Sequence, residues 1–517
     1  MKRVLLFAAV LCLLSGMVLP VHALEVEFKG EFYVEGLINS NEGMLEKDLT
    51  SDYRQMRLRM STDFNVTDSL SLTTRFDALE TVWGTTDSAV ASKSDQANID
   101  FDRAYLTYKS SIGMFQVGRM LGGCWGTDFA DDEIDADRIK WVAPLDMAGG
   151  KLYLLAINEK FSEYDKGTAL SDEDNDKYYL GGVFKTQTYS AGLLSAFYNY
   201  NTAQDLGQAF AVKAFNDVYA KDLANNPGNS LATYIGGYAA GLSTGGYNPA
   251  LGLPAAMGGA KDDPMNVLFT RGSTMSARLF LLSPYFAGKF GDFGISAELD
   301  YVWGAVEYEK KTLGKNPDRD VKALTYNVEG TYDMGPFTFQ AGYAFASGDA
   351  DYENAQSADF GKDEITSFGY LQPGVEWAKV FILNSDTHGM NTTLGNGIGN
   401  HVGSGSVTAS TCMIDGYQMF YGGVDYAVND KISLGLIAAA SKADAVPNNE
   451  PGEFYDDDQG VECDLTFTWK ITENLVYTAI GAYLDGGDYW KYRKDGKLNT
   501  NIKTDVYALY NQIKLTF

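Results

Sequence analysis

Apolar and polar residues alternate strictly near the start of the chain. Between residues 25 and 38 one parity is apolar: Val26, Phe28, Phe32, Val34 and Ile38. The other parity is charged: Glu25, Glu27, Lys29, Glu31 and Glu35. A two-residue period is typical of a β-strand with one apolar and one polar face. The same period continues through 56–64 and, after a short turn, through 70–78, which predicts a β-hairpin with matched faces.

Short turns alternate with long polar segments along the rest of the chain. We predict eight short turns: Asn65–Ser69, Ser110–Gly113, Pro144–Gly150, Lys185–Ser190, Lys289–Gly294, Tyr332–Pro336, Val428–Lys431 and Ile471–Asn474. Longer segments separate successive hairpins, including 84–97, 201–272 and 347–409. Short turns at one end and long loops at the other are typical of outer-membrane barrels. We therefore expect an all-β fold, a transmembrane antiparallel β-barrel of about 16–18 strands.

The one long apolar run, 4–20, lies at the start of the chain. It follows Lys2 and Arg3 and precedes Val21-His22-Ala23, which fits the small-x-small cleavage pattern. The run predicts a secretory signal peptide over 1–23 and leaves 24–517 as the barrel domain. An uncleaved anchor helix is the alternative.

Charge and composition narrow the classes of protein further. The chain has 68 acids and 41 bases, a formal charge of −27, and loss of the two bases in 1–23 takes it to −29. Such a chain repels phosphate, so we expect no nucleic acid among its partners. It has 33 Tyr, 55 Gly and 12 Pro, which suits many strands joined by turns and excludes a disordered chain.

The C-terminus carries the strongest local pattern. Leu509, Ile513, Leu515 and Phe517 share one parity, which Asn511 interrupts, and Phe517 is the last residue. A terminal aromatic residue behind alternating apolar residues resembles the signal that the barrel assembly machinery reads on outer-membrane proteins. We expect Ile513, Leu515 and Phe517 to form this assembly signal.

Three segments resemble bacterial outer-membrane porins of the trimeric general-diffusion type. Arg57–Leu70 resembles the second strand and first inner turn of these porins. Phe115–Arg119 resembles the strand that enters their constriction loop, and Asp137–Trp141 resembles the strand that leaves it. The resemblance implies a homotrimer in the bacterial outer membrane, in contact with membrane lipid and lipopolysaccharide.

In that family the third loop folds into the barrel and sets acids opposite wall arginines. The resemblance places this loop at 120–136, and its acids include Asp128, Asp131, Asp132 and Glu133. It places three arginines on the wall: Arg57, Arg119 and Arg138. Strand parity adds three more to the inner face: Arg59, Arg75 and Arg103. If Phe115 and Val117 face lipid, Arg119 does too, unless Gly118 marks a bulge.

Opposed rows of charge would orient dipolar solutes and filter them by charge and size. The expected function is passive diffusion of ions and small hydrophilic solutes through a water-filled channel, with no cofactor. One alternative is a substrate-specific, sugar-type channel, which 18 strands would favour. The other is a structural or adhesive barrel without transport. Locally, the acids could form a solvated external loop, and the arginines could line a lumen that has no narrowing.

Other candidate sites carry little chemistry. Cys124, Cys412 and Cys463 match no metal spacing and allow at most one disulfide. His388 and His401 lie in a segment rich in Gly, Asn, Thr and Ser, so we expect neither catalysis nor a metal. Near-helical apolar spacing over 204–224 predicts a short amphipathic helix within the loop 201–272.

Overall fold

The computed structural model describes the strands and the segments next to them. The described ranges are 25–40, 50–84, 99–131, 134–163, 174–201, 275–308, 319–348, 364–367, 377, 379–383, 416–446, 456–491, 500–501 and 503–517. The predicted signal peptide and the predicted helix in 201–272 lie outside them. Within these ranges, no helix is long and apolar enough to cross a membrane.

The described residues form 18 strands and a short 3-10 helix, η5 (Asp488–Lys491). The first nine strands are β1 (Glu25–Ser40), β2 (Thr50–Thr67), β3 (Leu70–Val82), β4 (Asp100–Ser110), β5 (Gly113–Gly122), β6 (Ile134–Met147), β7 (Gly150–Ser162), β8 (Asn175–Lys185) and β9 (Tyr189–Tyr200). The other nine are β10 (Met275–Phe290), β11 (Phe293–Tyr308), β12 (Arg319–Met334), β13 (Phe337–Ala346), β14 (Tyr417–Ala427), β15 (Ile432–Lys442), β16 (Asp458–Lys470), β17 (Leu475–Asp485) and β18 (Val506–Thr516).

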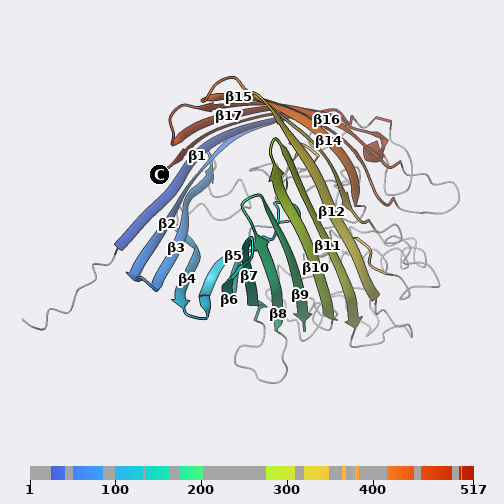
Figure 1. Cartoon of the computed structure of the whole chain (residues 1–517). Helices are drawn as coiled ribbons and strands as arrows, with labels where there is room; N and C mark the ends of the chain where they lie inside the picture. Colours follow the sequence, from blue (N-terminus) through green and yellow to red (C-terminus); the bar gives the residue numbers. More distant parts are fainter. Residues whose placement is uncertain are drawn as a thin grey trace, which may run out of the picture.

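The strands form one closed antiparallel sheet. Each strand pairs with its neighbours in sequence, and β18 pairs with β1 to complete the ring. Figure 1 shows the strands following one another in chain order around a curved wall, with the C-terminus beside β1. Closure leaves no unpaired strand edge, which a barrel in a membrane requires. The predicted all-β barrel is confirmed, at the upper end of the expected strand number.

All eight predicted turns lie between strands at one end of the barrel. The chain turns, for example, between Thr67 and Leu70 and between Ser110 and Gly113. The start of β1 and the end of β18 lie at this end too, because the number of strands is even. The other strand ends lead into the long segments that the sequence pattern separated from the turns.

The two faces of the wall have opposite character at the N-terminal strands. On β1, Phe28 is 64% exposed, whereas Glu35 on the other parity is 3% exposed. A water-soluble protein would bury the Phe and expose the Glu. An exposed apolar outer face and a polar inner face are instead expected of a barrel in a lipid bilayer.

Aromatic pairs lie on the outer face toward both ends of the strands. Toward the short turns, Tyr189 stacks on Phe286 with ring centroids 5.7 Å apart. Toward the long segments, Phe280 stacks on Trp303 at 5.6 Å. Aromatic girdles of this kind mark the two membrane–water interfaces of outer-membrane barrels.

Candidate functional site

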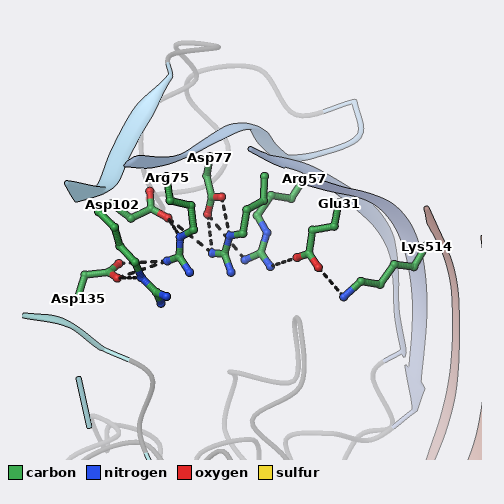
Figure 2. Close-up of polar contacts among 9 residues, drawn as sticks. Glu31, Arg57, Arg75, Asp77, Asp102, Asp135 and Lys514 are labelled. Carbon is green, nitrogen blue, oxygen red and sulfur yellow. Dashed lines mark hydrogen bonds and ion pairs between the residues drawn. The ribbon is translucent and has the colours of Figure 1, made fainter. Parts of the chain in front are cut away.

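A row of alternating charges crosses the inner wall from β18 to β6 (Figure 2). We call this set the charged row; in spatial order it comprises Lys514, Glu31, Arg57, Asp77, Arg59, Asp102, Arg75, Asp135 and Arg103. Its residues come from six strands, and strand alternation turns seven of them toward the lumen. Asp102 joins the row through a bulge, and the side chain of Asp135 reaches it from the start of β6. The row therefore runs across the strands rather than along any one of them.

The first half of the row lies on β18, β1, β2 and β3. Lys514 Nζ is 2.6 Å from Glu31 Oε2, and Arg57 Nη2 is 3.2 Å from Glu31 Oε1. Arg57 Nη1 is 3.9 Å from Asp77 Oδ2. Arg59 donates from Nε and Nη2 to the two oxygens of Asp77, both at 2.7 Å. The planar guanidinium makes such a two-point contact strong and directional.

The second half of the row continues on β3, β4 and β6. Arg75 Nε donates to Asp102 Oδ2 at 2.9 Å, and Arg75 Nη2 lies 3.4 Å from Asp135. Arg103 Nε donates to Asp135 Oδ1 at 2.6 Å. Arg59 also approaches Asp102, at 3.8 Å. The acids and bases of the row thus form one continuous network.

A β-bulge in β4 places two adjacent charges in this network. Arg75 pairs with Arg103 and Phe76 pairs with Phe101, so Asp102 is an extra residue opposite β3. A bulge lets two consecutive side chains face the same side of a sheet. Asp102 and Arg103 therefore both reach the lumen, while Phe101 stays on the outer face.

The stoichiometry of the row leaves one base in excess. Each acid bridges two successive bases: Glu31 joins Lys514 to Arg57, and Asp77 joins Arg57 to Arg59. The same pattern holds for Asp102 and Asp135 along the rest of the row. A base therefore stands at each end, and the formal charge of the row is +1. A strongly acidic chain thus carries a slightly cationic band on its inner wall.

Arg138 also lies on the inner wall, but outside the charged row. Its guanidinium contacts the carboxylate of Glu159, and Lys177 Nζ lies 3.3 Å from the other oxygen of Glu159. Arg138 Nη1 donates to the carbonyl of Leu121 at 3.2 Å. This second cluster spans β6, β7 and β8, and its acid is almost fully buried.

The expected position of Arg119 on the inner wall needs correction. Arg119 pairs in register with Asp137, and its neighbour Val117 is an exposed outer-face residue. The pairing of β5 with β4 and β6 continues through Gly118 without a shift, so parity turns Arg119 outward. There it lies 3.6 Å from Asp137, and both side chains are more than half exposed.

The expected constriction loop is shorter than 120–136 but does cross the lumen. Residues 120–122 belong to β5 and 134–136 to β6. Thr127 donates from its backbone N and from Oγ1 to Glu298 Oε2 on β11, both at 2.6 Å. Trp125 Nε1 donates to the carbonyl of Ser283 on β10 at 3.0 Å. A segment that leaves β5 and contacts β10 and β11 must lie inside the barrel.

Gly126 allows this loop to approach the opposite wall. A β-carbon at Gly126 would lie 2.7 Å from Glu298 Oε2 and 2.8 Å from Cγ of Tyr285. Its φ of +72° is also a left-handed conformation that side chains disfavour. Glycine is therefore required at this position for steric and conformational reasons.

Two of the expected loop acids, Asp128 and Asp131, lie in the described part of the chain. Asp128 is exposed, and Asp131 Oδ1 accepts a hydrogen bond from the backbone N of Trp125 at 2.7 Å, within the loop. Asp132 and Glu133 lie outside the described residues. The arginines of the charged row contact wall acids of β1, β3, β4 and β6 instead. Asp131 thus helps to shape the turn of the loop.

The inner wall of β10–β18 is apolar where it approaches the long segments. We call this surface the apolar half; it includes Leu279, Val302, Ala323, Ala344, Met419, Ala439, Leu484, Val506 and Ala508, all buried. Strands whose two faces are both apolar are covered on both sides. Part of the cover is residues 380–383, together with Trp377, which pack in the same cluster.

The two inward segments meet inside the barrel. Phe129 of the first packs edge-to-face on Trp377 of the second, with ring centroids 5.1 Å apart. Trp377 packs in turn on Tyr421 of β14. Since the apolar half is filled by packed side chains, the polar surface available to water lies on the side of the charged row.

Several residues of the site were missed by the sequence analysis. Three of them are wall acids: Asp77, Asp102 and Glu159. Strand parity alone could have placed Asp77 and Glu159 on the inner face. The bulge that turns Asp102 inward leaves no clear mark in a single sequence. Glu298 could not be found from pattern alone, because its partner Thr127 lies 171 residues away in the chain.

Comparisons with known proteins return structural neighbours only. No protein-family model and no curated protein matches the chain. Pseudomonas aeruginosa OccK8 (OprE) is 9% identical, with 95% of this chain and 98% of that chain covered and a TM-score of 0.46. The outer membrane protein OpdK of Pseudomonas aeruginosa is 10% identical, with 95% and 99% covered and a TM-score of 0.44. An anion-selective porin from Comamonas acidovorans is 9% identical, with 96% and 100% covered and a TM-score of 0.40.

The architecture of this chain is that of a transmembrane β-barrel of the outer-membrane type. The closed 18-stranded sheet, the apolar outer face and the charged inner wall all belong to that design. The predicted fold and the predicted membrane location are confirmed at this level.

Proposed function

We propose that the protein is a channel for passive diffusion of ions and small hydrophilic solutes across the outer membrane. The charged row is the observation that carries the proposal. Its nine side chains point into the barrel, and those of Glu31, Arg59 and Asp135 remain 20–24% exposed. Charges lining a lumen imply water beside them, because a dry lumen would impose a large desolvation cost.

The proposal needs neither a cofactor nor an energy source, and it makes the protein a channel rather than an enzyme. A homotrimer, contact with lipopolysaccharide and recognition by the barrel assembly machinery remain predictions of the family resemblance. Acids on the loop and at the mouths should enrich cations, whereas the charged row with its extra base should hold anions locally. The balance between these two fields decides the ion preference.

A substrate-specific channel is the second candidate. The apolar half restricts the polar passage to one side of the lumen, and the two inward segments narrow it further. A narrow passage beside fixed charges can select solutes by size and by the placement of their own charges. This candidate predicts saturable block of the current by the preferred solute.

Planar-bilayer recording separates these functions. Ohmic single-channel steps with a defined reversal potential in a salt gradient support a diffusion channel. Steps that a particular solute blocks in a saturable manner support the substrate-specific channel. The complete absence of steps from correctly folded protein would overturn both and favour a structural or adhesive barrel.

A further inference from the structure

We propose that Glu462 and Asp464 of β16 are positioning residues for a second constriction element, the segment 379–383. The inference rests on the proposed channel function, because it names the residues that set the width of the passage. The segment lies in the chain between β13 and β14, far in sequence from the loop between β5 and β6. No pattern in the sequence singled it out.

The two carboxylates hold the segment through its backbone. Glu462 accepts hydrogen bonds from the backbone N of Ile382 at Oε1 and of Leu383 at Oε2, at 2.6 and 2.7 Å. Asp464 Oδ2 accepts from the backbone N of Phe381 at 2.7 Å. Three consecutive N–H groups thus point at two acids that lie two residues apart on one strand. The carboxyl oxygens are strong acceptors, and all three bonds fall in the usual range for N–H donors.

The side chains of the segment cover the apolar half. Phe381, Ile382 and Leu383 are each at most 5% exposed, and Phe381 packs on Tyr510 of β18 with ring centroids 5.5 Å apart. A loop that packs apolar side chains against the wall also buries its backbone N–H groups, which no neighbouring strand pairs. The carboxylates satisfy its backbone donors, which allows the apolar side chains to pack without leaving those donors buried and unpaired.

The segment is also connected to the rest of the lumen. Lys379 Nζ lies 2.5 Å from Glu329 Oε2 on β12, beside Trp377. Trp377 contacts Phe129 of the loop between β5 and β6. Release of the segment from β16 would therefore remove its own bulk from the passage and weaken the support of the first loop. The two acids act through the segment and need not touch a passing solute.

The test uses the chain 24–517, from which the predicted signal peptide with Cys12 has been removed. It carries Cys124→Ser, Cys412→Ser and Cys463→Ser, to which Leu383→Cys is added. The probe is a water-soluble, positively charged methanethiosulfonate reagent applied to the reconstituted barrel. Glu462→Gln is the main variant. The two oxygens of Glu462 accept one N–H bond each, and in Gln an NH2 group replaces one of these oxygens and cannot accept that bond. Asp464→Asn is the milder variant, since its single bond can be made by the remaining carbonyl oxygen.

We expect labelling of Leu383→Cys to become about tenfold faster with Glu462→Gln, in line with the loss of one hydrogen bond, and less so with Asp464→Asn. Single-channel conductance should rise in the same order. Asp63→Asn is the matched control: Asp63 faces the lumen and contacts Lys29 and Thr73, far from the segment. The labelling rate should not change, and any change of conductance measures the loss of one lumen-facing acid alone. Heat-modifiable electrophoresis reports in each case that the barrel has formed.

Unchanged labelling in a folded Glu462→Gln barrel would overturn the anchoring role. Faster labelling with unchanged conductance would overturn the role of the segment as a constriction. If the parent protein gives no conductance, the proposed channel function fails, and the labelling rates still decide whether the acids hold the segment.

Discussion

Gly30 and Phe517 close the seam of the barrel together. The backbone N of Gly30 donates to the carbonyl of Phe517 at 2.8 Å, and the backbone N of Phe517 donates to the carbonyl of Gly30 at 3.0 Å. The Phe517 ring lies over Gly30, where a β-carbon would come within 2.7 Å of its Cζ. The last residue of the chain is therefore a structural part of the junction between β18 and β1.

Deletion of Phe517 should reduce the amount of protein that reaches the outer membrane more than it weakens a barrel already folded. The deletion removes two backbone hydrogen bonds, each worth about 1 kcal/mol net, from a closed sheet with many such bonds. Immunoblots of outer-membrane fractions, compared with urea unfolding of the refolded protein, measure the two effects. Gly30→Val, which displaces the ring but keeps Phe517, is the companion variant. Normal outer-membrane levels without Phe517 would contradict an assembly signal.

Replacement of Arg57 by Ala should raise cation preference and spare the fold. Its two acid partners, Glu31 and Asp77, keep a second base in Lys514 and Arg59. The charge of the row falls from +1 to zero, and a unit charge about 5 Å from a passing ion is worth about 0.8 kcal/mol in water. Reversal potentials in a salt gradient should shift toward cations by a few-fold in permeability ratio, less so at high salt.

Arg119→Ala is the control for this measurement. Arg119 has the same charge but lies on the outer face beside Asp137, so the reversal potential should stay at the wild-type value. A shift as large as that of Arg57→Ala would mean that Arg119 reaches the lumen after all. In that case the register at Gly118 would have to be reconsidered.

Replacement of Glu298 by Leu should release the loop between β5 and β6. The variant leaves two donors of Thr127 without their acceptor, which costs about 1–3 kcal/mol for a buried polar group. Larger and noisier conductance steps are expected, and a smaller change is expected for Glu298→Gln, which keeps one carbonyl oxygen. Identical traces for wild type and Glu298→Leu would show that the loop is held by other contacts.

The orientation of the barrel is testable by insertion of an epitope. The predicted site between Asn226 and Asn229 lies in the chain between β9 and β10, which it follows and precedes at their ends away from the short turns. It should bind antibody on intact cells, whereas an epitope in the short turn at 186–188 should bind only after the outer membrane is broken. The reverse result would place the long segments in the periplasm.

The N-terminal strands could be predicted well because one parity contacts lipid and the other contacts water. That contrast disappears from β10 onward, where buried apolar residues such as Leu279 and Met419 also face inward. Alternation in the sequence reports the polarity of the two surroundings, so it cannot reveal a lumen that is partly filled. The acids that hold the inward segments were equally hidden, because their partners are backbone groups and have no side-chain signature.

Parity also explains where the structure places the predicted arginines. Arg57, Arg59, Arg75 and Arg103 follow the strand period, whereas Arg119 was assigned to the wall against its own parity by family resemblance. The structure agrees with parity in each case. At Arg119, where strand alternation and the family resemblance disagree, the structure follows strand alternation.

Because Asp102 reaches the lumen through a bulge, the net charge of the inner wall depends on the number of residues in β4 as well as on their identity. Removal of that one residue would restore regular pairing in β4 and withdraw a negative charge from the lumen without exchanging any amino acid. Arg59 and Arg75 would then share one acid fewer, and the band would move toward attraction of anions. Insertions and deletions within a strand, usually regarded as damaging, offer such a barrel a route to new solutes.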